Sequence, residues 1–459
     1  MQSNHLLAIA TIAFVSCRES ASQVWYQEAP PVAPAARRFH GLDHDPSRAV
    51  TVLFGGADER SSQVFGDTWE YDGAEWSLRS TTGAPPRQRF AACMDRARGR
   101  FVVFGGIAAD GRGLGDTWQW DGTSWIPTLT LHAPPPRADA RMVFDEGRGR
   151  VVLFGGRPVD PGQPYGDTWE FDGADWMQRA PAGAPGPRFG HAMTFDARRG
   201  VSVVFGGFVN GAGGVGSDTW AYDGSAWVPV ATATRPAGCV FPALSTHRAH
   251  GVLVLTGGSG SASQALATYV WDGLDWQAGP AAPPELASRQ GHATAYDEAR
   301  EALVLFGGAS IARGGAVPRA DTWELSTPAS FTPFGHGCAT SAGVLELKAQ
   351  SRPVLGRTFS LAVGTLPPAA WPLLLLGRSD LVWQGMPLPW DLARLGMPGC
   401  SLFTSIDVAG PMIPLGQTAH ASLPIPLDRS LLGRQLFAQA VALGHEAATS
   451  NAGRVAFGN

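Results

Sequence analysis

The sequence predicts an all-β protein in which six copies of one four-stranded unit precede a smaller β-rich domain. Three observations predict this fold. Short β-branched and aromatic runs end on a Gly pair every 50 or 51 residues, as buried strands that stop at glycine do. An Asp-Gly turn and a spaced Trp follow in five of the six copies. The repeat stops after Trp323, and residues 331–459 carry a different pattern.

Each copy is expected to supply four strands. In residues 151–176, the run before Gly155 reads as a second strand, Asp167-Thr168-Trp169 opens a third, and Trp176 marks a fourth. An Asp and an Arg three residues apart before this run indicate a turn between the first and second strands. The six Gly pairs begin at Gly55, Gly105, Gly155, Gly206, Gly257 and Gly307.

This period, with a strand that ends in Gly-Gly and a spaced Trp, closely resembles the Kelch repeat. The resemblance implies a six-bladed β-propeller over residues 22–330. The sixth copy has no Trp for its fourth strand, whereas Trp25 stands alone before the first copy. We expect Trp25 to fill that position and to close the ring, with Phe331 as the competing candidate.

Loops that differ among the copies indicate the binding surface. They join the second and third strands, and in Kelch propellers they share a face with the connections from one blade to the next. Loops on a rigid scaffold commonly carry recognition, although these could also be plain solvated loops. They span residues 57–66, 107–115, 157–166, 208–217, 259–266 and 309–320.

A repeated arginine is the main candidate for ligand binding. It stands eighteen residues before the Gly pair in every copy but the fifth, which has Cys239. One interpretation is a ring of guanidinium groups that binds a carboxylate or a sulfate. The other is a structural ion pair with the Asp of Asp-Thr-Trp, because the fifth copy lacks both and has Ala267 instead of that Asp. The five residues are Arg37, Arg87, Arg137, Arg188 and Arg289.

Catalytic and metal-binding patterns are scarce, so no catalytic residue, metal site or cofactor is assigned. His40, His191 and His292 recur at one repeat position, which favours a structural role. Some Kelch propellers are enzymes, such as galactose oxidase and the sialic acid mutarotases. The periodic tyrosines argue against a copper oxidase, whereas a sugar-active enzyme of the mutarotase type stays open. It would need non-periodic charged residues such as Arg157 and Arg313.

Residues 331–459 are predicted to form a small β-sandwich. Expected strands cover residues 358–366, 371–376, 402–408, 418–425, 435–443 and 454–457. Cys338 and Cys400 would form a disulfide, whereas Cys93 and Cys239 are expected to be buried free thiols rather than a bridge. The motifs Pro424-Ile425-Pro426 and 450–452 resemble a carboxy-terminal domain of secreted planctomycete-type bacterial proteins, which implies export.

The amino terminus also predicts export. Residues 6–15 are apolar and suit a signal peptide within residues 1–21. Cys17 resembles the lipidated residue of a bacterial lipobox, and cleavage near Ser22 is the alternative. No apolar run is long enough to span a membrane, and a formal net charge of −4 argues against nucleic acid as a partner. We therefore expect a secreted or envelope protein that binds a glycan or an envelope protein.

Overall fold

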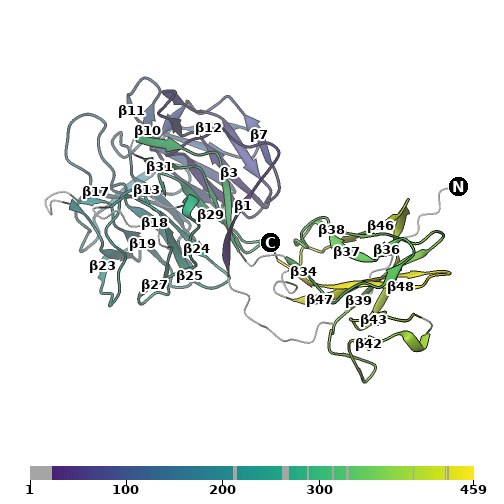
Figure 1. Cartoon of the computed structure of the whole chain (residues 1–459). Coiled ribbons are helices and arrows are strands. Elements are labelled where there is room, and N and C mark those ends of the chain that lie inside the picture. The colour runs from purple at the N-terminus through teal and green to yellow at the C-terminus, as the bar shows by residue number, and fades with distance from the viewer. Residues whose placement is uncertain are drawn as a thin grey trace. The chain divides into compact units, whose positions relative to one another are not determined.

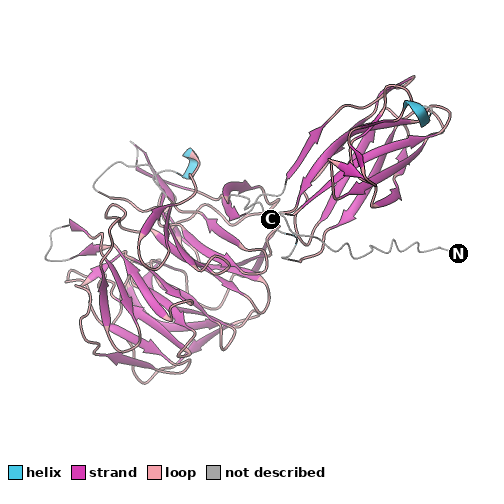
Figure 2. Cartoon of the chain, turned by 90° about the horizontal axis from the view of Figure 1, so that it is seen from below, coloured by secondary structure: helices cyan, strands magenta, loops and turns pink. Residues whose placement is uncertain are grey.

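The chain forms two compact units, one over Gln23–Ser326 and one within residues 327–459. The computed structural model describes residues 23–209, 214–260, 268–286, 289–312, 315–326, 330–395, 397–428, 431 and 434–458. Strands make up nearly all of the regular structure (Figure 2). In the described part of the chain, the helical elements are two single 3-10 turns, η1 (Pro284–Leu286) and η2 (Ala393–Leu395).

The first unit is a six-bladed propeller, as the sequence predicts, and each blade is a four-stranded antiparallel sheet (Figure 1). The first strands are β2 (Gly41–Asp45), β9 (Ala91–Asp95), β13 (Arg141–Asp145), β18 (Ala192–Asp196), β24 (Ala243–His247) and β29 (Ala293–Asp297). The second strands are β3 (Val50–Phe54), β10 (Arg100–Ala108), β14 (Arg150–Phe154), β19 (Val201–Phe205), β25 (Val252–Thr256) and β30 (Ala302–Phe306). The third strands are β6 (Thr68–Tyr71), β11 (Gly113–Trp120), β15 (Thr168–Phe171), β22 (Thr219–Tyr222), β26 (Tyr269–Trp271) and β33 (Thr322–Ser326). The fourth strands are β7 (Trp76–Ser80), β12 (Trp125–Thr128), β16 (Trp176–Arg179), β23 (Trp227–Val230), β27 (Trp276–Ala278) and β1 (Val24–Glu28).

The amino-terminal strand closes the ring. β1 pairs with β33, with Trp25 opposite Leu325, so the expectation for Trp25 is confirmed. The competing Phe331 lies in β34 of the second unit and pairs with Val455. Six apolar clusters, one between each pair of adjacent blades, form the propeller core. Because the ring is closed, each blade packs against two neighbouring blades.

Short strands add to the loops of the propeller. They are β4 (Ala57–Asp58), β5 (Gln63–Val64), β8 (Arg87–Gln88), β17 (Arg188–Phe189), β20 (Phe208–Val209), β21 (Gly214–Val215), β28 (Arg289–Gln290), β31 (Ala309–Ala312) and β32 (Gly315–Pro318). Some of them pair residues before a first strand with the loop between the second and third strands, as in β17 with β20 and β28 with β31. Others pair within that loop, as in β4 with β5. Both kinds of loop therefore lie on one face of the propeller, which we call the loop face.

The second unit is a β-sandwich with its own core. One sheet has the order β34 (Ser330–Phe334), β48 (Ala448–Ala456), β47 (Gln435–Leu443), β39 (Trp371–Gly377) and β44 (Val408–Pro411). The other has the order β37 (Glu346–Ala349), β38 (Thr358–Gly364), β46 (Thr418–Pro424) and β45 (Ile413–Leu415). Three small hairpins are β35 (Ala339–Thr340) with β36 (Gly343–Val344), β40 (Val382–Trp383) with β41 (Met386–Pro387), and β42 (Trp390–Asp391) with β43 (Ser401–Leu402).

One expected strand of the sandwich is wrong. The segment 402–408 leaves β43 after Leu402 and is irregular until β44 begins at Val408. Single hydrogen bonds, not a regular strand ladder, hold it: Phe403 N donates to Gln439 Oε1 at 2.9 Å, and Asp407 N donates to Leu376 O of β39 at 3.0 Å. The Ser405 hydroxyl also donates to Asp407 at 3.0 Å, a local bond that competes with strand pairing.

Candidate functional site

The six first strands surround a central channel with two cavities. One has a volume of about 100 Å³ and the other about 120 Å³. Residues that precede the first strands line the smaller, loop-face cavity, and residues that follow them line the larger, turn-face cavity. The shared lining forms a largely apolar waist made of Leu42, Ala92, Met142, Met193, Leu244 and Thr294.

A closed ring of backbone hydrogen bonds surrounds the loop-face cavity. We call this ring the collar. One residue of each blade donates its N–H to the C=O of the member from the adjacent blade, over 2.7–3.1 Å, until the ring closes. All six members have a positive φ, between 57° and 65°. In order, each donating to the next, they are Phe39, Gly291, Phe241, Gly190, Asp139 and Arg89.

The collar side chains form an aromatic and charged rim. Phe39 and Phe241 pack edge to face, with ring centroids 5.1 Å apart. The Arg89 guanidinium lies 3.6 Å from the centroid of the Phe39 ring and donates to Asp139 at 3.1 Å. Arg157 donates to the other oxygen of Asp139 at 2.9 Å. This gives Arg157, a sequence candidate, a partner at the rim, whereas Arg313 lies outside the described residues.

Below the rim, Arg141 lines the loop-face cavity from the start of β13. It forms no ion pair with any described residue, and its hydrogen bond is to the adjacent Ala140 carbonyl at 3.5 Å. Burial lowers the pKa of Arg141, Asp139 opposes this effect, and nearby Arg89 lowers the pKa further. The cavity therefore contains one guanidinium that forms no ion pair with a described carboxylate, although the charge of Asp139 acts on it.

The five repeated arginines are fully buried ion-pair partners. Each guanidinium binds the Asp of Asp-Thr-Trp through two parallel hydrogen bonds of 2.6–2.9 Å and also donates to the first Gly of the Gly pair. The pairs are Arg37–Asp67, Arg87–Asp116, Arg137–Asp167, Arg188–Asp218 and Arg289–Asp321. Burial alone would raise the pKa of these carboxyls, but the hydrogen bonds from arginine outweigh it and the pKa values are lowered. This geometry supports the ion-pair interpretation, and a ligand role for these arginines stays a prediction.

The rest of Asp-Thr-Trp also has a structural role. The Trp of the triplet donates Nε1 to the Asp of the same copy at 2.7–2.8 Å. The Thr accepts from the fourth-strand Trp of the adjacent blade at 2.8–3.1 Å. These bonds link Trp25 to Thr268, Trp76 to Thr322, Trp125 to Thr68, Trp176 to Thr117, Trp227 to Thr168 and Trp276 to Thr219.

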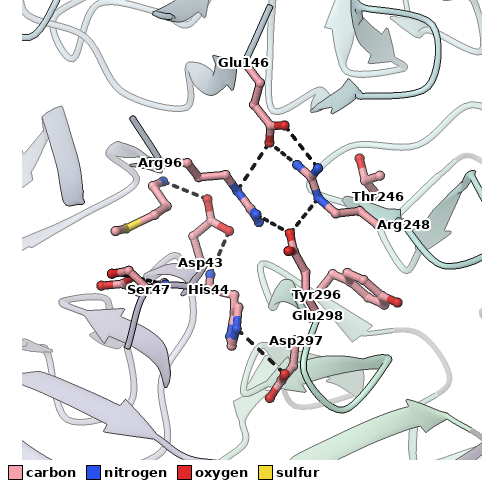
Figure 3. Close-up of polar contacts among 12 residues, drawn as sticks. Asp43, His44, Ser47, Arg96, Glu146, Thr246, Arg248, Tyr296, Asp297 and Glu298 are labelled. Carbon is pink, nitrogen blue, oxygen red and sulfur yellow. Dashed lines mark hydrogen bonds and ion pairs between the residues drawn. The ribbon is translucent and has the colours of Figure 1, made fainter. Parts of the chain in front are cut away.

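At the other end of the channel, four charged side chains form the turn-face cluster: Arg96, Glu146, Arg248 and Glu298 (Figure 3). Arg248 Nε lies 2.8 Å from Glu298 Oε1, and its Nη1 donates to Glu146 at 3.1 Å. Arg96 Nε lies 3.5 Å from Glu146, and its Nη1 contacts Glu298. The positive and negative groups alternate, so their charges balance within the cluster.

Asp43 lies behind this cluster in the turn-face cavity. Its two oxygens accept from the backbone N–H groups of His44 and Met94, each at 2.8 Å. The carboxylate is therefore already hydrogen-bonded. No group of three or more His, Cys, Asp or Glu side chains suited to a metal ion occurs among the described residues.

The periodic histidines are buried, and His40 and His292 also line the loop-face cavity. His40 packs against Phe306 and His191 against Phe154, with ring centroids 5.6 and 5.5 Å apart. Burial, followed by the nearby arginine, lowers the pKa of both well below its usual value. The same causes lower the pKa of His292 to about 3. These rings are neutral at physiological pH.

Sequence reasoning missed Arg141 and the turn-face cluster, although the internal repeat contains the signal. The first residue of the first strand is Gly or Ala in the five other blades, and Arg141 alone is charged. The residues after the first strands are Pro46, Arg96, Glu146, Ala197, Arg248 and Glu298. Charged residues that break the repeat were sought in the variable loops, whereas the structure places these at the ends of the innermost strands.

The cysteines lie as expected where the structure describes them. Cys338 and Cys400 form a disulfide, and Cys93 and Cys239 are buried and free. Cys17 and the predicted signal segment lie outside the described residues, as does Ala267. Across the described ranges, no helix has the length and apolar character needed to cross a membrane.

Comparison with known proteins gives a family match and matches to solved structures. The KLHDC2/KLHL20/DRC7 Kelch-repeats domain matches residues 15–172 and 124–308 in two overlapping segments, which together span more than half of the chain. A solved structure titled "Structure of YjhT" is 15% identical with a TM-score of 0.49, and the match covers 65% of this chain and 97% of that one. No curated protein matches the chain.

Proposed function

This chain belongs to the Kelch-repeats family, and from that premise we propose that it is an exported protein that binds a glycan or a protein of the cell envelope through its loop face. A Kelch propeller supports a binding role in general. The Cys338–Cys400 disulfide supports export, because disulfides persist mainly in oxidising compartments.

The observation that carries the proposal is the conformation of the collar. Its six members share one left-handed backbone conformation, which costs a residue with a Cβ roughly 1–2 kcal/mol and costs glycine little. Gly190 and Gly291 show that glycine fits there. Phe39, Arg89 and Phe241 nevertheless have bulky side chains at this strained φ. Such strain collects where side chains serve binding.

Replacing a rim side chain by glycine tests this role. Phe241→Gly removes one aromatic ring and relieves the strained φ, so we expect at least tenfold weaker binding with a nearly unchanged unfolding midpoint. Binding to a glycan array and to purified envelope proteins is measured on the exported protein. Leu274→Ala, at a side chain that is 79% exposed in the β26–β27 turn, is the control. Equal binding by the wild type and Phe241→Gly would contradict recognition at the rim.

A sugar-active enzyme of the mutarotase type is the second candidate. One observation favours it: Arg141 is a non-periodic charged residue in the channel, as that hypothesis requires. Saturation-transfer NMR with neutral and acidic sugars separates the two functions. Faster exchange between anomers indicates catalysis, and saturation transfer without faster exchange indicates binding alone.

A further inference from the structure

We propose that Arg141 binds the carboxylate of a small organic acid or an acidic sugar in the loop-face cavity. The inference deepens the proposed function and rests on it, since this cavity lies inside the collar. It concerns one side chain in one blade, and it is independent of the five repeated arginines.

The first argument is charge. A guanidinium removed from water is stable when a carboxylate compensates it, and each of the five buried repeat arginines has such a partner. Arg141 is only partly exposed, yet its one polar contact within the described chain is the long bond to Ala140 O. The other arginine of the cavity, Arg89, contacts Asp139 at 3.1 Å and Glu59 at 3.7 Å, two carboxylates that Arg157 and Arg38 also contact. A bound anion would supply the missing charge at Arg141.

The second argument is position. β13 begins with Arg141, whereas the other first strands begin with Gly41, Ala91, Ala192, Ala243 and Ala293. Small residues on the other five strands leave the space into which one long side chain reaches. A residue needed only for the blade would recur with the repeat, as the Arg–Asp pairs do. Arg141 occurs once.

The third argument is the chemistry of the walls. The rings of Phe39 and Phe90 and the apolar waist line the same cavity, whose volume is about 100 Å³. One planar fork of donors matches one carboxylate, and the mixed polar and apolar walls suit the carbon skeleton and hydroxyl groups attached to it. The cavity therefore favours a singly charged organic acid.

The test compares glucuronate with glucose, and acetate with acetamide, on the exported protein by isothermal titration calorimetry. We expect binding of the two acids and none of the neutral analogues. Arg141→Met should weaken binding of the acids at least tenfold, and Arg141→Lys less so. Arg198→Met, the same change at an exposed arginine next to the turn between β18 and β19, should have no effect.

Stability distinguishes this site from a structural arginine. Removal of a partly exposed charge without an ion-pair partner should leave the unfolding midpoint of Arg141→Met unchanged or higher, whereas loss of a structural contact would lower it. Binding of the acids that Arg141→Met does not weaken would overturn the proposal. So would binding of a peptide with a free carboxyl terminus but of neither acid.

The two proposals fail differently. If the protein binds an envelope glycan or protein and Phe241→Gly abolishes that binding, the proposed function holds even when Arg141→Met binds as well as the wild type. Only the carboxylate site then fails. If Phe241→Gly also binds unchanged, both proposals fail.

Discussion

At the scale of single residues, the repeat separates side chains that build the blade from side chains that are free to vary. Asp-Thr-Trp shows the first kind, because its Asp binds a buried Arg, its Thr binds a Trp of the adjacent blade, and its Trp binds the Asp. The Asp carboxylate, the Thr hydroxyl and the Trp indole N–H therefore each have a structural partner. Arg141 and the turn-face cluster show the second kind.

Loss of one repeated arginine should destabilise the propeller. Arg188→Met leaves the Asp218 carboxylate, whose side chain is 42% exposed, without its cation, and loss of these charged hydrogen bonds should cost about 1–3 kcal/mol. Urea denaturation measures the free energy of unfolding, and Arg198→Met, an exposed arginine, should change it by less than about 0.5 kcal/mol. Weaker ligand binding with an unchanged free energy of unfolding would instead favour the ligand-ring interpretation.

At the scale of elements, the ring depends on a strand that comes from the other end of the propeller sequence. β1 pairs with β33 in register from Val24 opposite Ser326 to Glu28 opposite Thr322. Trp25 adds a buried ring and a hydrogen bond to Thr268 in the next blade. Without β1, the edge of β33 would be unpaired, and a sheet edge of this kind promotes aggregation.

Trp25→Ala should therefore lower the free energy of unfolding by about 3–5 kcal/mol, the usual cost of truncating a buried Trp. Trp371→Ala, at a side chain that is 76% exposed in the second unit, is the matched control and should have little effect. Thermal unfolding followed by tryptophan fluorescence and calorimetry measures both. Equal midpoints for the two variants would show that ring closure does not depend on this residue.

Most strands and turns of the propeller could be predicted from the sequence, because hydrophobic runs, glycine pairs and turn residues repeat together. The missing fourth strand was found at Trp25 because the sixth copy lacked it. The collar could not be predicted, since its left-handed positions hold Phe, Arg and Asp as well as Gly. The irregular segment after Leu402 was missed because the distant Gln439 side chain and isolated backbone bonds hold it in place of a regular ladder.

At the scale of the whole molecule, burial of many titratable groups makes stability depend on pH. Burial lowers the pKa of His40 and His191 far below 6.5 and that of His292 to about 3. The unfolded chain takes up these protons below pH 6.5 and the folded chain does not. Stability is therefore complete above about pH 6.5 and declines as the pH falls toward the folded pKa values. The five paired Asp carboxyls, with lowered pKa values, add a further loss below about pH 4.

One substitution isolates the histidine contribution. His191→Phe introduces the residue that blade two has at the same repeat position, Phe90, so the packing should be retained. It should reduce the pH dependence of the free energy of unfolding by about 1.4 kcal/mol per pH unit between pH 6 and 4. Urea titrations at several pH values measure this slope. His445→Phe, at an exposed position of the second unit, should not alter it, and an unchanged slope in His191→Phe would contradict the assignment.

The collar bonds all run in one rotational sense, and each member uses both its N–H and its C=O in the ring. The rim therefore offers an incoming molecule no free main-chain N–H at these six residues. Under the proposed function, the side chains of the rim distinguish one ligand from another, because the six blades share the same backbone conformation there. Related chains could change what they recognise through a few substitutions there, with no change in the path of the backbone.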